Sequence, residues 1–171
     1  MIKNLKPDKY YKNIYDIDYR KLKKKGIKYL LFDLDNTIGD NRCHHPEEKA
    51  INLFKELKEL NMTPILISNA LPWRVKAYAN DLDCDAYWLS AKPRKKNYLK
   101  IINKYNPKQE EVACIGDQIY TDIKGAKRFG YTSILVDRIS KYESYFSIPN
   151  RIREKINIYN KKVITKGDYY E

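Results

Sequence analysis

The fold is decided by residues 29–37, which read YLLFDLDNT. A short apolar run here ends in two carboxylates one residue apart, and a hydroxyl follows. Gly26 and Gly39 bound the run, which predicts a fully buried strand. Open α/β sheets hold ligands at the carboxyl ends of their strands, so we expect Asp33 at the strand tip and Asp35 on the loop beyond. Two acids this close repel each other unless a cation lies between them, and hard oxygen ligands favour Mg²⁺.

Length and composition are typical of one globular domain that folds unaided. The chain has 34 Lys and Arg against 22 Asp and Glu, a formal net charge of +12, which favours anionic partners. Its cysteines, Cys43, Cys84 and Cys114, suit a reducing compartment and match no zinc spacing. The N-terminus has no signal-type apolar core, and no apolar run approaches membrane-spanning length. We therefore expect a cytoplasmic protein, with peripheral contact to a membrane left open.

Strand-like and helix-like segments alternate regularly after Gly26. Such alternation predicts βαβ units. The expected fold class is α/β, a Rossmann-like three-layer α/β/α sandwich with a five-stranded, mainly parallel sheet, in a single domain over residues 1–171. We predict strands at 29–32, 63–67, 86–89, 112–115 and 132–136, and helices at 46–60, 72–80, 93–105 and one that ends at Gly130.

Both ends of the chain are basic and lie outside this alternation. Residues 1–26 are predicted to form a basic N-terminal extension, with a short helix through Leu22 that Asp16 or Asp18 caps. Residues from about 140 to 171 are predicted to form a basic helical tail. We expect the apolar stripe of this helix to pack on the domain, and the alternative is a helix lying on anionic lipid. The stripe consists of Ile148, Ile152, Ile156 and Tyr159.

Polar side chains suited to phosphoryl transfer follow the predicted strands. In this chemistry a carboxylate attacks phosphorus, and a second acid protonates the leaving oxygen and later activates water. A metal ion, a hydroxyl and a cationic side chain hold the phosphoryl oxygens. The candidate set comprises Asp33, Asp35 and Thr37, then Ser68 and Asn69, then Lys92, and finally Gly116, Asp117 and Asp122.

This set resembles the motifs of the haloacid dehalogenase (HAD) superfamily. The matching segments are FDLDNT at 32–37, ILISN at 65–69, the lysine of Ala91-Lys92-Pro93, and Gly-Asp with a further Asp five positions on, at 116–122. Over roughly residues 14–138 the chain is similar to the capless subfamily IIIA phosphatases of the YqeG type. That group is related to the phosphatases that convert phosphatidylglycerophosphate to phosphatidylglycerol.

The resemblance implies a Mg²⁺-dependent phosphomonoester hydrolase that works through an aspartyl phosphate. It makes Asp33 the nucleophile and a metal ligand, Asp35 the general acid/base whose backbone carbonyl also binds the metal, and Asp117 the third protein ligand. It further implies that Ser68 holds a phosphoryl oxygen and that Lys92 neutralises Asp33 and the phosphate. Phosphate binding is also implied for Asn69, and supporting roles for Thr37, Gly116 and Asp122.

The spacing of the motifs leaves no room for a cap domain. The predicted helix at 46–60 fills most of the stretch between Asp35 and Asn69, and the stretch from there to Lys92 is short. An uncapped site admits a lipid headgroup, a nucleic-acid end or a phosphoprotein, unless a partner subunit or the tail covers it. Four basic residues at the rim are expected to steer a polyanionic substrate. They are Arg74, Arg94, Lys95 and Lys96.

Phosphatidylglycerophosphate is the substrate that we predict first. A nucleic-acid end and a small phosphorylated metabolite are the enzymatic alternatives. A non-catalytic RNA- or ribosome-associated protein on the same scaffold is the alternative of another class. Intact Asp33, Asp35, Lys92 and Asp117 argue against that alternative, because a pure binder has no need of them. The oligomeric state is left open.

Overall fold

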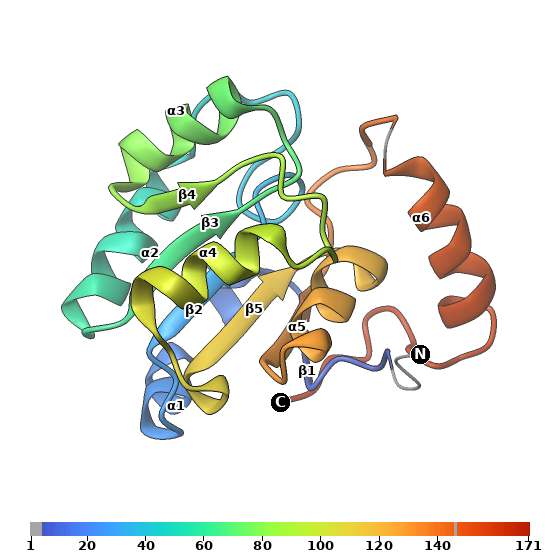
Figure 1. The fold of residues 1–171 in the computed structure, drawn as a ribbon. Coiled ribbons are helices and arrows are strands. Elements are labelled where there is room, and N and C mark those ends of the chain that lie inside the picture. The colour runs from blue at the N-terminus through green and yellow to red at the C-terminus, as the bar shows by residue number, and fades with distance from the viewer. Residues whose placement is uncertain (1–4, 146) are drawn as a thin grey trace.

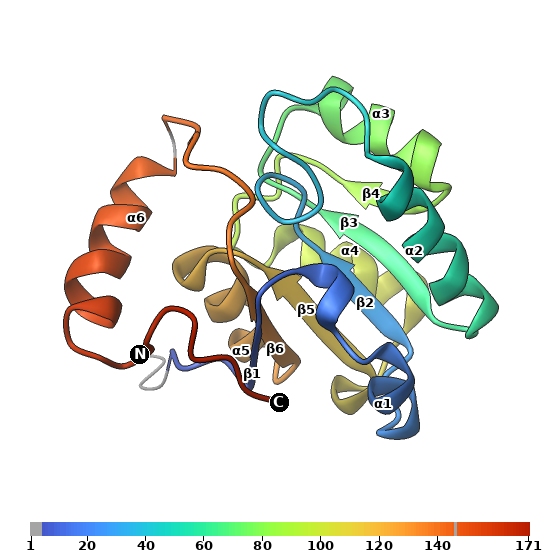
Figure 2. The same ribbon diagram turned by 180° about the vertical axis from the view of Figure 1, so that it is seen from behind.

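Six parallel strands form one sheet in the order β1-β6-β5-β2-β3-β4 (Figures 1 and 2). The structure is a computed structural model, and it describes residues 5–145 and 147–171. Every pairing in the sheet is parallel. The strands are β1 (Lys9–Tyr11), β2 (Tyr29–Phe32), β3 (Thr63–Ile67), β4 (Asp85–Tyr87), β5 (Val112–Gly116) and β6 (Thr132–Val136).

Helices cover both faces of the sheet, as the expected three-layer sandwich requires. Successive residues of a strand point to opposite faces, so Leu30 and Phe32 pack under α1–α3 while Leu31 packs under α4 and α5. The described helices and loops between the strands contain no cap domain. The α-helices are α1 (Tyr19–Lys24), α2 (Glu48–Glu59), α3 (Pro72–Leu82), α4 (Lys96–Tyr105), α5 (Lys124–Arg128) and α6 (Ile148–Glu154).

The sheet has six strands, so the expected number of five was one too few. The added strand, β1, is three residues long and lies at the edge of the sheet beside β6. On its other side the N–H of Tyr10 donates to the carbonyl of Tyr170 at 2.8 Å, and Tyr170 donates back at 2.9 Å. The N-terminal extension and the C-terminal tail therefore contact each other at this edge.

The short helix expected in the N-terminal extension is α1. The Asp18 side chain caps it by accepting a hydrogen bond from the N–H of Lys21 at 2.8 Å. Gly26 follows with a φ of +93°, a left-handed conformation that favours glycine. Further along, α4 begins at Lys96 and not at residue 93, because residues 91–94 first form a turn in which Arg94 donates to the carbonyl of Ala91.

The C-terminal helix packs on the domain with a different face from the one expected. Ile148, Ile152 and Ile156 are 41%, 55% and 53% exposed, so the prediction that the stripe packs on the domain was wrong for these three residues, whereas Tyr159 packs against the buried cluster around Ile158. The helix is held instead by Glu154, whose carboxylate accepts the N–H groups of Ile119 at 2.6 Å and Tyr120 at 3.3 Å. Those N–H groups open the helical turn Ile119–Ile123, and a helix start attracts an anion. Among the described residues, no helix is long and apolar enough to cross a membrane.

Candidate active site

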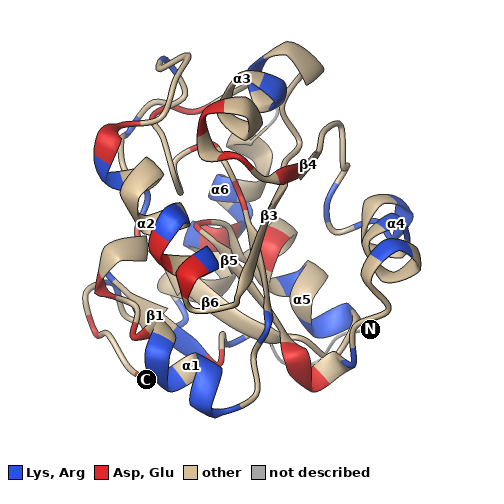
Figure 3. Ribbon diagram, turned by 90° about the vertical axis from the view of Figure 1, so that its left-hand side faces the viewer, with Lys and Arg blue, Asp and Glu red and all other residues tan. Residues whose placement is uncertain are grey.

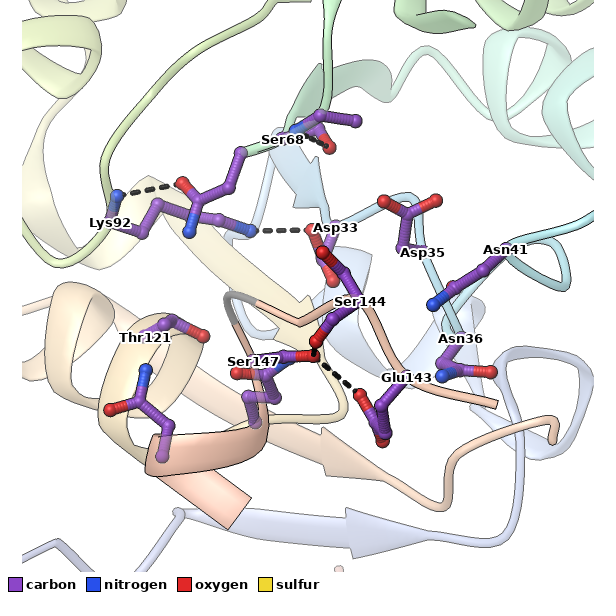
Figure 4. A pocket seen from close by; sticks show the side chains of 14 residues that line it. Asp33, Asp35, Asn36, Asn41, Ser68, Lys92, Thr121, Glu143, Ser144 and Ser147 are labelled. Atoms are coloured by element: carbon purple, nitrogen blue, oxygen red, sulfur yellow. Dashed lines mark hydrogen bonds and ion pairs between the residues drawn. The ribbon is translucent and has the colours of Figure 1, made fainter. Parts of the chain in front are cut away.

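The carboxyl ends of the strands converge on one pocket (Figure 4). Loops after β2, β3, β4 and β5 contribute the side chains that the motifs predict. The segment after β6 also lines the pocket, with Glu143, Ser144, Ser147 and Asn150. The site is thus assembled from the end of every strand except the edge strand β1.

Lys92 lies at the centre of the site and bridges two carboxylates. Its Nζ is 2.6 Å from Oδ1 of Asp33 and 2.6 Å from Oδ1 of Asp122. Burial by itself lowers the pKa of the Lys92 ammonium, but the attraction of Asp122 and Asp33 outweighs burial and raises it above its usual value. The ammonium is therefore charged at neutral pH and balances both acids.

The loop after β4 is held so that Lys92 reaches this position. The N–H of Lys92 donates to the side-chain oxygen of Asn69 at 2.8 Å, which joins the loop to the end of β3. Asn97 in α4 donates to the hydroxyl of Ser90 at 2.8 Å and to the carbonyl of Trp88 at 2.9 Å. Sequence analysis did not single out Asn97 or Ser90, because a buried polar residue inside an amphipathic helix carries no catalytic motif.

Gly116 allows Asp122 to approach the end of β5. A Cβ at this position would lie 2.3 Å from Cγ of Asp122, so any side chain would displace that carboxylate. Burial raises the pKa of Asp122 to about 6, although the Lys92 ammonium opposes the shift. Both oxygens of Asp122 are held, one by Lys92 and the other by the N–H of Gln118 at 3.1 Å.

Asp33, Asp117 and Asp122 form a buried acidic cluster that fits a divalent cation. One carboxylate oxygen from each lies within 4.8 Å of the others. Burial raises the pKa of Asp117 well above its usual range, and the nearby Arg151 guanidinium opposes the shift. Buried carboxylates in such number are stable as anions only beside cations, and oxygen donors suit a hard divalent ion. The donor set therefore fits a divalent cation, and Asp122 belongs to the same cluster as the two predicted ligands Asp33 and Asp117.

Asp35 is paired with Arg74, which does not lie at the rim. Nε of Arg74 donates to Oδ1 of Asp35 at 2.8 Å, and the arginine is only 6% exposed. Its other nitrogens donate to the carbonyls of Asp40, at 2.8 Å, and Cys43. Arg74 thus holds Asp35 and the loop after β2 in place. The expectation that Arg74 lies at the substrate rim was wrong. Sequence spacing could not separate the two roles, since the partner of Arg74 lies in a loop 39 residues away in the chain.

The remaining predicted residues fall into two groups. Ser68 is buried at the end of β3, where its Oγ accepts the N–H of Ala70 at 3.1 Å and keeps its own proton available to a ligand. The Thr37 hydroxyl donates to Oδ1 of Asp117 at 3.3 Å. The other group is exposed at the start of α4 and consists of Arg94, Lys95 and Lys96. A substrate-steering role for these residues stays a prediction.

The C-terminal segment supplies site residues that sequence analysis missed. Ser147 donates to Glu143 at 2.8 Å, and both lie across the pocket from Ser68 (Figure 4). Arg151 in α6 reaches the carboxylate and the carbonyl of Asp117. In the sequence, Arg151 stands among isoleucines at helical spacing and carries no motif that marks it as a site residue.

The basic cluster of α1 lies far from this pocket. Residues 26–28 connect α1 to the amino end of β2, whereas Asp33 follows the carboxyl end of the same strand. Figure 3 shows the Lys and Arg positions of α1 at the opposite end of the molecule from α3. A substrate that binds at the pocket therefore does not meet these lysines.

Comparisons with known proteins agree with this geometry. Residues 41–130 match the model of the haloacid dehalogenase-like hydrolase family. The chain is 32% identical over 149 residues to "Probable phosphatase YqeG" of Bacillus subtilis (strain 168), and the match covers 87% of each protein. These matches confirm the resemblance to YqeG-type phosphatases of the HAD superfamily that the motifs indicate.

Two solved structures share the fold at low identity. One is a protein of Legionella pneumophila assigned to HAD subfamily III A, with a TM-score of 0.52, 19% identity, and coverage of 70% of this chain and 71% of that chain. The other is an HAD-like family hydrolase of Porphyromonas gingivalis, with a TM-score of 0.54, 13% identity, and coverage of 78% and 100%. These structures share the fold, and the sequence matches show that the chain belongs to the haloacid dehalogenase-like hydrolase family.

Proposed function

We propose that this protein is a Mg²⁺-dependent phosphomonoester hydrolase in which Asp33 is the nucleophile. The observation that carries the proposal is the placement of Lys92 between Asp33 and Asp122, at 2.6 Å from each. Lys92 compensates the charge of a buried carboxylate at the mouth of a pocket, where an incoming phosphate would add further negative charge. A structural ion pair has no need of the serine, threonine and acid that surround it.

In the proposed reaction an oxygen of Asp33 bonds to phosphorus while the bond from phosphorus to the ester oxygen breaks. Asp35 gives its proton to that leaving oxygen, then takes a proton from the water that hydrolyses the aspartyl phosphate. Arg74 holds Oδ1 of Asp35, which leaves Oδ2 for the proton. Ser68 and Lys92 hold phosphoryl oxygens. Mg²⁺ held by Asp33, Asp117 and the carbonyl of Asp35 would neutralise charge on the phosphoryl group.

The surroundings of the pocket favour a phosphorylated lipid headgroup, and we propose phosphatidylglycerophosphate. Leu71 and Trp73 are each 55% exposed at the start of α3, and Leu89 is 52% exposed after β4. Exposed apolar side chains beside a basic rim are typical of proteins that work at an anionic membrane surface.

A single unpaired acceptor points to a hydroxylated leaving group. Asn41 lines the pocket, and its side-chain oxygen is buried with no hydrogen-bond partner among the described residues. An unpaired buried acceptor is unfavourable by about 1–3 kcal/mol, so a substrate that brings a hydroxyl donor is favoured here. A glycerol headgroup carries such donors.

A small phosphorylated metabolite is the second candidate. The observation that favours it is the C-terminal segment, which lines one side of the pocket and narrows an otherwise open site. A polar wall of Glu143, Ser147 and Asn150 suits a compact hydrophilic leaving group as well as a lipid headgroup.

The test is Mg²⁺-dependent phosphate release from phosphatidylglycerophosphate in mixed micelles, beside soluble phosphate esters, with Asp33→Asn as the control. We expect release from the lipid to exceed release from soluble esters and to vanish in the variant. Release from soluble esters alone would retain the phosphatase and replace the lipid by a metabolite. No release from any ester would remove the proposed activity.

A further inference from the structure

Arg151 joins the acidic cluster to the C-terminal segment. Its Nη2 pairs with the carboxylate of Asp117, and its Nη1 donates to the carbonyl of the same residue at 2.8 Å. Nε donates to Glu143 at 2.8 Å, and Nη1 also lies 3.2 Å from Glu154. One guanidinium therefore contacts a candidate metal ligand, a side chain of the pocket wall and the anchor of its own helix.

The Asp117 carboxylate is held on both oxygens by this arrangement. Arg151 takes Oδ2, and the Thr37 hydroxyl takes Oδ1 at 3.3 Å. The Asp117 side chain has no exposed surface and that of Arg151 is 16% exposed, so the pair is shielded from water. The planar fork of an arginine fixes the orientation of its partner, which a lysine cannot do.

The pocket wall depends on the same guanidinium. Glu143 accepts Arg151 on one oxygen and the Ser147 hydroxyl on the other. Arg138 also contacts Glu143, at 3.2 Å, from the start of the segment. Because the isoleucines of α6 are exposed, these polar contacts, the carboxylate of Glu154 and the buried Ile158 hold the segment over the site.

We propose that Arg151 is a positioning residue of the active site, which orients Asp117 and fastens Glu143 and Ser147 as the leaving-group wall. The metal part of this role rests on the proposed function. Arg151 does not touch the substrate. It acts through Asp117 on the cation site and through Glu143 on the shape of the pocket.

Four proteins test the role: wild type, Arg151→Lys, Arg151→Met and the control Arg153→Met. Arg153 lies in the same helix, is exposed, and places its guanidinium over the ring of Tyr120, 4.4 Å from the centroid. The lysine variant keeps the charge and loses the fork, whereas the methionine variant loses both. The control removes a cation from α6 without touching the site.

The first measurement is a titration of the melting temperature with Mg²⁺ in the absence of substrate. The quantity compared between variants is the Mg²⁺ concentration at which half of the total rise in melting temperature is reached. We expect it to increase about 10-fold or more in Arg151→Lys and in Arg151→Met, as when a residue that orients a metal ligand is lost, and to stay unchanged in Arg153→Met. If Arg151 acted only as a positive charge, the lysine variant would be unchanged and the methionine variant would bind Mg²⁺ more tightly. That result would overturn the positioning role.

The second measurement is the rate of chymotrypsin cleavage after Tyr142 and Tyr145, both of which are exposed. We expect Arg151→Met to be cleaved about 10-fold faster than wild type, because cleavage follows the population of the undocked segment. Equal rates, or the same increase in Arg153→Met, would overturn the fastening role. This result needs no activity, so it stands even if the wild type hydrolyses no phosphate ester.

The third measurement is hydrolysis of p-nitrophenyl phosphate at saturating Mg²⁺. We expect Arg151→Lys to lower kcat about 10-fold or more, with a smaller change in KM, because the misplaced carboxylate acts on the reacting phosphoryl group. A wild-type kcat in this variant would contradict the proposal. An inactive wild type would remove the proposed function, and with it the metal part of this role.

Discussion

Two regions of different kinds build the same pocket. The loops after β2 to β5 present Asp33, Ser68, Lys92 and Asp117, all of which are buried and follow the end of a strand by one or a few residues. The segment after β6 crosses the pocket at a distance from its strand and leaves Ile148, Ile152 and Ile156 exposed. It is held by Arg151, Glu154, hydrogen bonds to Asn36, and the buried Ile158 and Ile164. The sheet positions the first region directly, whereas polar contacts and one small apolar cluster position the second.

This difference indicates that the two regions have different functions in the proposed reaction. Reaction chemistry needs side chains placed to within a fraction of an ångström, which strand ends provide. Recognition of a leaving group tolerates a wall with lower local stability, which can also open for substrate entry. Substitutions of Asp33, Ser68, Lys92 or Asp117 are therefore expected to change kcat, and substitutions of Glu143 or Ser147 to change KM or the choice of substrate.

The largest effect is expected from Asp33→Asn. The amide keeps the shape of the side chain but cannot form an aspartyl phosphate, so kcat should fall by at least about 10³-fold. Release of phosphate from p-nitrophenyl phosphate measures it, with the melting temperature as a check on folding. A variant that keeps a tenth of wild-type activity would place the nucleophile elsewhere and break the assignment of chemistry to the loops.

Lys92→Met is expected to lose both activity and stability. It leaves Asp33 and Asp122 buried without their shared cation, and removing one partner of a buried ion pair is unfavourable by about 3 kcal/mol or more. Mg²⁺ should recover part of that loss, because a divalent cation in the cluster neutralises the same carboxylates. Urea unfolding with and without Mg²⁺ measures the difference, and an equal loss in both conditions would contradict a cation site here.

The loops were predictable from sequence because the relevant signal is local. An apolar run shows where a buried strand ends, and the next polar residue must lie at the edge of the sheet. For Asp33, Ser68 and Asp117 nothing more is needed, since parallel strands bring their carboxyl ends together. The pairing of Lys92 with two acids is a consequence of that order of strands.

The second region was not predictable for the opposite reason. The stripe of isoleucines in α6 satisfies the usual pattern of a buried helix face, yet the helix docks through Glu154, which accepts N–H groups 35 and 34 residues earlier in the chain. β1 was missed likewise, because three residues beside a sheet edge carry no periodicity. Arg74 was misplaced because its partner, Asp35, belongs to another loop.

A smaller effect is expected at Asn41, where the two regions meet. Its amide nitrogen donates to the carbonyl of Tyr142 at 3.3 Å, while its oxygen is the unpaired acceptor described above. Asn41→Leu should raise KM for a hydroxylated substrate by about 10-fold, with little change in kcat, because a hydrogen bond to the substrate is lost. It should not lower the melting temperature, since the unpaired acceptor also disappears. A fall in kcat with unchanged KM would place Asn41 in the chemistry instead.

The smallest effect is expected from the rim, and it separates charge at the pocket from charge elsewhere. Replacing Arg94, Lys95 and Lys96 by glutamine removes three exposed cations at the start of α4, whereas replacing Arg20, Lys24 and Lys25 removes three exposed cations at the opposite end of the sheet. Steering of an anionic substrate acts within about one Debye length, so only the rim variant should raise KM for phosphatidylglycerophosphate micelles, by a few-fold at low salt and by less at high salt. Equal changes in both variants would mean that net charge, and not the rim, draws the protein to the micelle. In that case the carboxyl-end loops would supply the chemistry without any part in attracting the substrate, and the C-terminal segment alone would be left to select it.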